Sequence, residues 1–399
     1  MHIVMVLGID FMKPYVDGRV HREARSLVRA GHKVTIICWA RTITNEMTTG
    51  EPEKEVYDGI RVKRVFSPIS PIGSSIIRRV SQHLRAMKAI AAEISDIKAD
   101  ALHFHDFNTL FVLRYLKDNR LPVVYDSHED FINMLDDVLP SYMLWYARIT
   151  ERKLIKKVDV AITIAEPVAA SLAEYGAGKV VLVMNCRELS DYESIKPASI
   201  KKRRTEMAPK KETTVLYIGS IGRDRGLKEL TDVFKMALVD PEIKKQMKNV
   251  KLILGGMGHL EKRVVECIKG MKNVDWVGYV PGKTLIEYNL AADIMVVLFN
   301  DARPNQARTL PNKLFEAMAA GKPIIVCKGT ESAKIVEAEK CGLIVSYGDK
   351  KALGNAIVKL VEDKKLRMKL GKAGLAAAKR EYNWKVQEKR LLDVYKSLK

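Results

Sequence analysis

The stretch DARPNQARTLPNKLFEAMAAGKPIIV, residues 301–326, decides the fold because a loop, a helix and a strand follow one another within it. Pro304 and Pro311 interrupt its first part, which we expect to be a polar loop. A short Ala-rich helix should begin at Asn312, the expected N-cap, and end at the Gly-Lys-Pro of residues 321–323. The apolar residues 324–326 then indicate a buried strand, as in an α/β domain.

Polar groups gather at the start of this helix. The free N–H groups of a first turn, together with the helix dipole, form a ready site for phosphate. Backbone amides and Lys313 would hold a diphosphate there. Glu316 lies about one turn further on, and its carboxylate can accept two hydroxyl hydrogen bonds, as from a ribose. The pairing predicts a site for a nucleoside diphosphate.

The segment PNKLFEAMAAGKPII resembles the donor-site segment of retaining glycosyltransferases of family 4 (group 1), which have the two-domain GT-B fold. The common form of the family has two Glu residues separated by seven others. Glu316 matches the second, whereas the first falls on Arg308. The resemblance therefore implies that the sugar-facing carboxylate is absent, is replaced by a neighbour such as Asp301, or is replaced by the amides of Leu310 to Lys313.

Length and composition indicate a soluble two-domain protein. A chain of 399 residues with 47% hydrophobic and 29% charged residues is long enough for two cores. No apolar run reaches the roughly 18 to 20 residues that a membrane span needs, and no basic leader precedes the first strand, so we expect a cytoplasmic protein. Five scattered cysteines without C-x-x-C spacing favour neither a disulfide framework nor a zinc site.

The net charge of +20 attracts polyanions of any kind: nucleic acid, anionic lipid or phosphorylated substrate. A lysine-rich solvated surface is an equally good explanation. Basic helices are expected at residues 76–90 and 141–157. Their apolar stripes can pack into the core, or they can lie on an anionic membrane, as acceptor-domain helices do in lipid-modifying members of the family.

The chain begins with a predicted strand, helix and strand at residues 2–7, 18–30 and 33–39. The loop between the first strand and the helix has no G-x-G-x-x-G, which argues against a simple dehydrogenase. The resemblance implies that Gly18 belongs to a Gly-rich loop over the donor phosphates. Only one of the two usual glycines is present, so an ordinary turn glycine is the alternative.

Polar residues follow two apolar strands in DALHFHDF and VVYDSHED. They should lie at strand C-terminal ends, where open parallel sheets bind ligands. The resemblance implies that His105 faces the acceptor and the transferred sugar, and that Asp126, His128 and Glu129 are acceptor-side or loop-ordering groups. A satisfied structural histidine is the alternative for His128. The two histidines of H-x-H point one way without a third ligand at a fitting spacing, so we expect no metal site.

We place the first domain at residues 1–195, a Pro- and Lys-rich linker at 196–212 and the second domain at 213–380. The terminal helix, 381–399, should pack back on the first domain, as the resemblance implies. The first domain would bind the acceptor and the second would bind the nucleotide sugar.

The second domain begins with a strand that runs into GSIGRDRGLKELTDVF, a Gly-rich turn before a helix. The family usually has an Arg and a Lys-Gly here, which grip the diphosphate. Arg225 matches the Lys, Ser220 stands where Arg is common, and Arg223 would substitute for it. The resemblance further implies close-approach glycines in the donor site and a main-chain contact with the nucleobase, here Gly256, Gly258 and Val280.

We therefore expect an α/β protein with two facing Rossmann-like, doubly wound domains (GT-B) and a cleft between them. It would transfer a hexose-type sugar from a UDP- or GDP-sugar to a lipid-linked or saccharide acceptor, with retention and without metal or cofactor, in cell-surface polysaccharide or glycolipid synthesis. The expected catalytic residues are His105, Arg225 and Lys313, with donor contacts from Gly18, Ser220, Arg223, Gly256, Gly258, Val280, Leu310, Asn312 and Glu316.

Two alternatives stay open. A sugar-nucleotide epimerase or hydrolase on the same fold would bind the donor without transferring its sugar. A nucleic-acid-binding protein would exploit the positive charge, but zinc-finger, recognition-helix and aromatic RNA-binding patterns are not evident in the sequence. We therefore expect no nucleic-acid partner.

Overall fold

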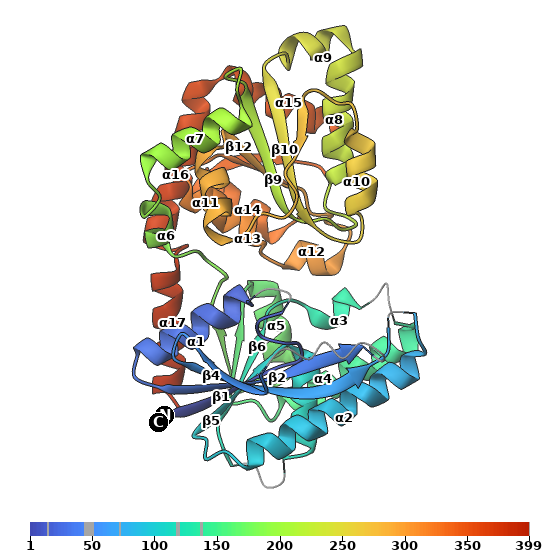
Figure 1. Ribbon diagram of the computed structural model, residues 1–399, viewed down its shortest axis with the longest axis vertical. Coiled ribbons are helices and arrows are strands. Elements are labelled where there is room, and N and C mark those ends of the chain that lie inside the picture. Colours follow the sequence, from blue (N-terminus) through green and yellow to red (C-terminus); the bar gives the residue numbers. More distant parts are fainter. Residues whose placement is uncertain (14–15, 44–51, 72, 117–119, 136–138, 399) are drawn as a thin grey trace. The chain divides into compact units, whose positions relative to one another are not determined.

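The computed structural model describes residues 1–13, 16–43, 52–71, 73–116, 120–135 and 139–398. The chain divides into two compact units. Unit 1 comprises Met1–Val183 and Glu388–Lys399, and unit 2 comprises Met184–Gln387. Each unit consists of one sheet with helices packed against it (Figure 1).

Within the described residues, the sheet of unit 1 has eight strands in the order β3-β4-β2-β1-β5-β6-β7-β8. Neighbouring strands are parallel, except for the antiparallel pair of β3 and β4. The strands are β1 (His2–Leu7), β2 (Lys33–Ile43), β3 (Lys54–Tyr57), β4 (Ile60–Ile69), β5 (Ala101–His105), β6 (Val123–Ser127), β7 (Val160–Thr163) and β8 (Lys179–Leu182). The strand order reverses between β1 and β5, which makes their carboxyl ends the expected ligand-binding position of this unit.

The helices of unit 1 are α1 (Gly18–Arg29), α2 (Ile76–Ser95), the 3-10 helix η1 (Phe107–Arg114), α3 (Phe131–Met134), α4 (Ser141–Ile155) and α5 (Glu166–Glu174). Alternation along the strands decides which side chains face which helices. Phe104 and Tyr125 belong to an apolar core that includes Met87 of α2. The residues that alternate with them, such as His103 and Asp126, point to the opposite face, where α1 packs.

In the part of unit 2 that the structure describes, six parallel strands follow the order β11-β10-β9-β12-β13-β14. They are β9 (Thr213–Ser220), β10 (Val250–Met257), β11 (Val274–Trp276), β12 (Ile294–Val297), β13 (Ile324–Cys327) and β14 (Gly342–Val345). This sheet is also doubly wound, with its reversal between β9 and β12.

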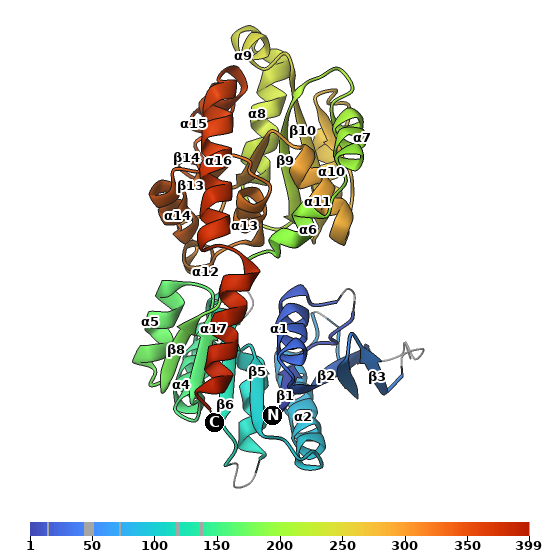
Figure 2. The ribbon, with the colours of Figure 1, turned by 90° about the vertical axis from the view of Figure 1, so that its left-hand side faces the viewer.

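The helices of unit 2 are α6 (Leu189–Glu193), α7 (Pro197–Met207), α8 (Leu227–Val239), α9 (Pro241–Gln246), α10 (Glu261–Ile268), α11 (Gly282–Ala291), α12 (Pro304–Arg308), α13 (Asn312–Ala319), α14 (Glu331–Glu339), α15 (Lys350–Glu362) and α16 (Lys364–Arg380). Helix α15 packs against both α8 and α16 (Figure 2). The core of this unit joins Leu230 of α8 and Ile357 of α15 to strand residues such as Leu252.

The last helix, α17 (Trp384–Lys396), begins in unit 2 and ends in unit 1. Near its end, the hydroxyl of Tyr395 lies 2.7 Å from Nδ1 of His103, and both side chains are fully buried. This polar pair is tolerated in the core because the Tyr395 hydroxyl and Nδ1 of His103 satisfy each other. The contact anchors the end of the chain to β5.

The structure differs from the expected linker at 196–212. Residues 197–207 form α7, which packs on α11, and the two units divide between Val183 and Met184 rather than after residue 195. Arg204 fixes this helix, because its guanidinium donates to the Asp293 carboxylate at 2.6 Å and to the hydroxyl of Thr214 at 2.8 Å. Polar pairs of this kind replace an apolar stripe, so helical periodicity could not reveal the helix.

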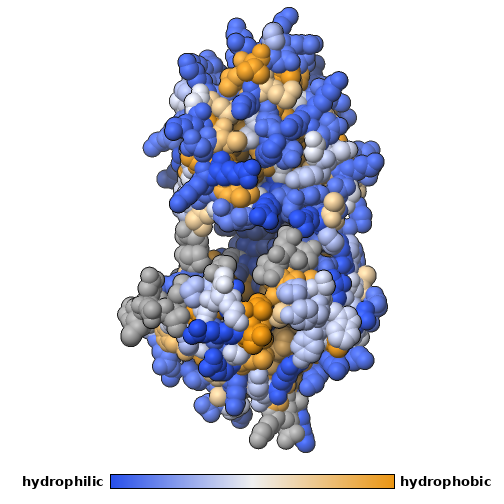
Figure 3. All heavy atoms as spheres, turned by 90° about the vertical axis from the view of Figure 1, so that its right-hand side faces the viewer, coloured by the Kyte–Doolittle hydropathy of each residue, from blue (hydrophilic) through white to orange (hydrophobic). Residues whose placement is uncertain are grey.

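On the face that Figure 3 shows, the surface is mostly hydrophilic, and hydrophobic residues gather in several groups. None of the helices among the described residues is long and apolar enough to cross a membrane.

Candidate functional site in each unit

A cavity of about 330 Å³ lies where the strand order of unit 1 reverses. Gly8, which follows β1, and His105, which ends β5, both line it. Asp17, Arg41 and His128 contribute further polar groups to its walls. The position agrees with the general rule that open α/β sheets bind ligands at such a point. It also places predicted residues His105 and His128 on one cavity.

The buried residues behind this cavity form one polar network. Nδ1 of His105 lies 3.0 Å from Nε2 of His128, which lies 3.0 Å from the Asp126 carboxylate. Arg19 donates to both oxygens of Asp126, at 2.8 and 2.7 Å. His103 stacks on His105 with ring centroids 4.3 Å apart, so the two histidines point one way as the H-x-H spacing predicted. The carbonyl of Glu129 accepts from the hydroxyl of Ser127.

The charges of the network follow from its partners. Burial lowers the pKa of His128, but Asp106 and Asp126 outweigh that effect and raise it to about 10. Burial lowers the pKa of His105, with partial opposition from Asp126. The cavity is therefore lined by a cationic His128 beside a neutral His105 at neutral pH. Burial opposes ionisation of Asp126, yet Arg19 and His128 hold its pKa well below the ordinary value.

Glu23 belongs to this cluster and, like Arg19, was not selected as a site residue from the sequence. It is fully buried on α1 and lies 3.1 Å from Nε of Arg19, one turn earlier. Burial, then the charge of Asp126, raises the pKa of Glu23 to about 8, with Arg19 opposing. The sequence did offer a signal for this pair. Arg19 and Glu23 lie four positions apart in a helix whose other residues on that face are mostly apolar, which indicates a buried ion pair.

Glu23 also corrects the argument that H-x-H lacks further ligands. Glu23, His103, His105 and Asp126 each offer a ligand atom, all within 4.8 Å of one another. The missing ligands came from distant segments and could not be found by spacing. The guanidinium of Arg19 already pairs with both carboxylates, so a cation at this position would meet a positive charge.

In unit 2, α13 begins differently from the prediction. Pro311 is the N-cap and Asn312 is the first helical residue, and the cap makes no side-chain hydrogen bond. Proline supplies no side-chain acceptor for the N–H groups of the first turn. The first turn therefore keeps donors for an anionic ligand, which suits the predicted phosphate site better than a capping Asn would. Leu310, just before the cap, is buried and fixes the approach of the loop.

Glu316, on the same helix, is almost fully buried and forms an ion pair with Arg187. Burial disfavours the Arg187 cation, but Glu316 and then Tyr192 raise the pKa of the guanidinium. Arg187 was not predicted, because its partner is 129 residues away. The sequence offered no signal for the pairing.

Lys313 lies among aromatic and charged groups. Its ammonium is 4.5 Å from the ring centroid of Tyr217, and a Cβ on Gly219 would collide with its side chain. Burial lowers the pKa of Lys313 to about 8; Glu316 opposes this effect, and Arg225 and Arg187 reinforce it. These Coulombic effects indicate that Lys313, Arg225, Arg187 and Glu316 lie in one region of unit 2.

The loop after β9 carries the other predicted basic residues. Arg225 stacks on Phe299, with its guanidinium carbon 4.4 Å from the ring centroid. Asp224 orders the loop by accepting from Asn300 at 3.0 Å and from Arg303 at 3.1 Å. Arg223 is exposed, and the carbonyl of Ser220 accepts from the hydroxyl of Tyr217 at 2.7 Å.

Gly256 and Gly258 both have positive φ, and a Cβ at either position would collide with backbone, at Gly219 and Ile221 respectively. These glycines are required for strand packing in unit 2, whatever contact they make with a ligand. Val280 is buried beyond β11. In unit 1, Gly18 begins α1 without positive φ, and Asp17 caps that helix. The ligand contacts expected of Gly256, Gly258, Val280 and Gly18 stay predictions.

Arg308 ends α12, where the resemblance would have placed a Glu. Asp301 packs against the Gly329 turn, since a Cβ on that glycine would lie 2.8 Å from its carboxylate. Asp301 is exposed, and its role in place of the missing Glu stays a prediction.

Two doubly wound α/β units, one with a cavity at its strand reversal and the other with a basic, uncapped helix start, define a glycosyltransferase of the GT-B fold. The chain belongs to the group 1, family 4 glycosyltransferases. The model "Glycosyl transferases group 1" matches residues 199–376, and "Glycosyltransferase Family 4" matches residues 18–190.

The comparisons with individual proteins agree. An uncharacterized glycosyltransferase of Methanocaldococcus jannaschii is 24% identical over 384 residues, which cover 94% of this chain and 92% of the relative. Sucrose-phosphate synthase from Thermosynechococcus elongatus superposes with a TM-score of 0.76 at 19% identity, covering 100% and 99% of the two chains. Anabaena HepE, solved with UDP and glucose, gives 0.73 at 16% identity and 99% coverage of both. The solved structures support the fold.

Proposed function

We propose that the protein transfers a hexose from a nucleoside diphosphate sugar, UDP- or GDP-linked, to a hydroxyl of a lipid-linked or saccharide acceptor, with retention at the anomeric carbon. The observation that carries the proposal is the start of α13. The helix has an uncapped first turn and Lys313, which would bind the diphosphate. It also carries the buried Glu316, whose carboxylate would accept hydrogen bonds from the ribose hydroxyls. The UDP and glucose bound to the Anabaena structure support this donor class.

In this mechanism the bond from the anomeric carbon to the diphosphate breaks as a bond to the acceptor oxygen forms on the same face. The acceptor proton passes to an oxygen of the leaving phosphate. Arg225, Lys313 and the α13 amides stabilise the charge that grows on this phosphate. They would do so without a metal or cofactor. Because the leaving group itself takes the proton, Arg308 in place of a Glu is compatible with retention.

His105 would position the acceptor hydroxyl and the transferred sugar. Its ring is held by the His128 and His103 contacts, and its lowered pKa keeps it neutral. Asp126 and Arg19 act through His128 and hold the network in place. In this proposal, these residues would orient an acceptor in the cavity of unit 1.

Helix α4 of unit 1 favours a role at a membrane, in cell-surface polysaccharide or glycolipid synthesis. Helix α4 exposes Tyr142, Trp145 and Tyr146, and its last turn is basic. Exposed aromatic rings beside lysines are typical of segments that rest at a membrane interface. We therefore propose a peripheral position on an anionic inner membrane face.

A two-step experiment tests the proposal. Thermal shift with UDP, GDP, ADP and their sugars first identifies the base, and a radiolabelled donor is then incubated with neutral and phosphorylated saccharides and with lipid extracts. Label in a saccharide or lipid product supports transfer. Donor cleavage that no acceptor stimulates supports a hydrolase, and a changed sugar on the intact nucleotide supports an epimerase. Failure to bind any nucleoside diphosphate overturns the proposal.

A further inference from the structure

The cavity of unit 1 contains carboxylates that are already engaged. Asp17 accepts from the backbone N–H groups of Arg19 and Val20, at 3.0 and 3.1 Å. Asp106 accepts from the N–H of His128 at 3.2 Å, and its carboxylate lies 3.6 Å from the imidazole. Neither acid therefore needs a cationic ligand.

Arg41, in contrast, has neutral partners. Its Nη2 donates to the carbonyl of Gly8 at 2.6 Å, and its guanidinium lies 4.8 Å from the ring centroid of Trp39. In the part of the chain that the structure describes, no carboxylate forms an ion pair with it. The side chain is exposed and lines the cavity, so a ligand can reach it.

The charge of a second guanidinium acts on Arg41. Desolvation, and then the charge of Arg79 on α2, lowers the pKa of Arg41, which shows that the two arginines repel each other. Nε of Arg79 is buried and has no hydrogen-bond partner. Two like charges that act on each other raise the energy of the empty site, and an anion bound to Arg41 in the cavity would offset that repulsion.

We propose that the acceptor carries a phosphate group, which Arg41 binds with support from Arg79 while the reacting hydroxyl lies at His105. The inference deepens the proposed function and rests on it. A guanidinium suits this role because its fork matches two phosphate oxygens. His128, which is cationic in the same cavity, adds to the attraction. A sugar or polyol phosphate and a phospholipid head group present the same chemistry.

The test uses the full chain with its donor site saturated by the nucleoside diphosphate found in the thermal-shift screen. Calorimetry then measures inorganic phosphate and glycerol 3-phosphate, with glycerol as the neutral probe. Flotation compares phosphatidylcholine vesicles with and without phosphatidylglycerol. Wild type should bind glycerol 3-phosphate at least about tenfold more tightly than glycerol, or should bind the phosphatidylglycerol vesicles if the phosphate must be lipid-linked.

The variants Arg41→Gln and Arg79→Gln should weaken phosphate-dependent binding, Arg41→Gln by roughly 10- to 100-fold, as expected for lost charge-assisted hydrogen bonds. Arg78→Gln is the matched control, because it removes an exposed charge from the same helix. Arg41→Lys keeps the charge without the fork, and thermal unfolding checks that each variant is folded. The proposal is overturned if Arg41→Gln behaves like Arg78→Gln, or if wild type shows no phosphate dependence in either form.

The two proposals fail in different ways. Normal nucleotide binding without any preference for phosphorylated probes contradicts the phosphate proposal alone. Absence of nucleoside diphosphate binding in wild type contradicts the proposed function.

Discussion

Arg187 and Glu316 form an ion pair within unit 2, although they are 129 positions apart in the chain. The pair holds the Glu316 carboxylate in place before any nucleotide arrives. A ribose would have to share this carboxylate with Arg187 or displace it. Because Glu316 is almost fully buried, its hydrogen bonds to a ligand would form away from solvent, where they are stronger.

Replacing Glu316 by Gln should weaken nucleotide binding by about 10- to 100-fold, because each charge-assisted hydrogen bond contributes roughly 1.5 to 3 kcal/mol. Calorimetry with the nucleoside diphosphate measures the change. Glu287→Gln is the matched control, since Glu287 pairs with Arg203 elsewhere in this unit. Unchanged affinity in a folded Glu316→Gln protein would remove Glu316 from the donor site.

The lowered pKa of Lys313, about 8, predicts a pH dependence of nucleotide binding. Below pH 8 the ammonium is already charged, and above pH 8 a proton must be taken up with the anionic ligand. Diphosphate affinity should therefore fall as pH rises through about 8, by up to tenfold per unit. Calorimetry from pH 6.5 to 9.5 tests this, and Lys313→Met should flatten the curve. The corresponding nucleoside, without phosphate, should show no such fall.

The donor and acceptor residues differ in how far the sequence could predict them. Lys313 and Glu316 could be selected together because they lie three positions apart on one helix, and local order preserves that spacing. The domain folds could also be predicted, since apolar strands alternate with amphipathic helices through most of the chain. Arg19 and Asp126 are 107 residues apart, and only folding brings them together. Helix α7 escaped prediction for the related reason that ion pairs hold it.

Transfer activity should survive EDTA, since amides, Arg225 and Lys313 provide the positive charge that a metal would otherwise supply to the leaving phosphate. The assay is sugar transfer after dialysis against EDTA, with magnesium or manganese added back to one half. Loss of activity that either metal restores would contradict this donor mechanism.

Tyr395→Phe should destabilise unit 1, because it leaves Nδ1 of the buried His103 without its partner. The expected loss is about 1 to 3 kcal/mol of unfolding free energy. Urea unfolding measures it, and Tyr142→Phe on the exposed face of α4 is the control. Equal stability of the two variants would show that the contact contributes little.

Membrane attachment through α4 should have an electrostatic part and an aromatic part. Each Lys or Arg near an anionic surface adds about 1 kcal/mol, and the screening length falls from about 10 Å at 0.1 M salt to about 3 Å at 1 M. Vesicle flotation should therefore show attachment at low salt that falls at high salt. The binding that remains at high salt should depend on Trp145.

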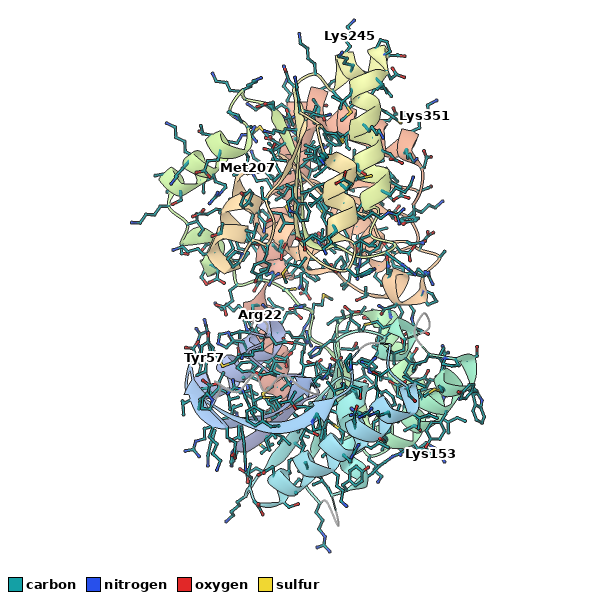
Figure 4. The ribbon with its side chains drawn as sticks, turned by 45° about the vertical axis from the view of Figure 1, so that its right-hand side comes forward. Arg22, Tyr57, Lys153, Met207, Lys245 and Lys351 are labelled. Atoms are coloured by element: carbon teal, nitrogen blue, oxygen red, sulfur yellow. The ribbon has the colours of Figure 1, made fainter. Side chains whose placement is uncertain are left out.

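Lys153 lies at the surface of unit 1 and Lys245 at the surface of unit 2 (Figure 4). Replacing Lys153 and Lys156 by Gln should reduce flotation, whereas replacing Lys244 and Lys245 should not. The proposal is contradicted if the two double variants float alike, or if the protein does not bind anionic vesicles at low salt. The positive charge would then be only a solvated surface, and a soluble acceptor would be the better explanation.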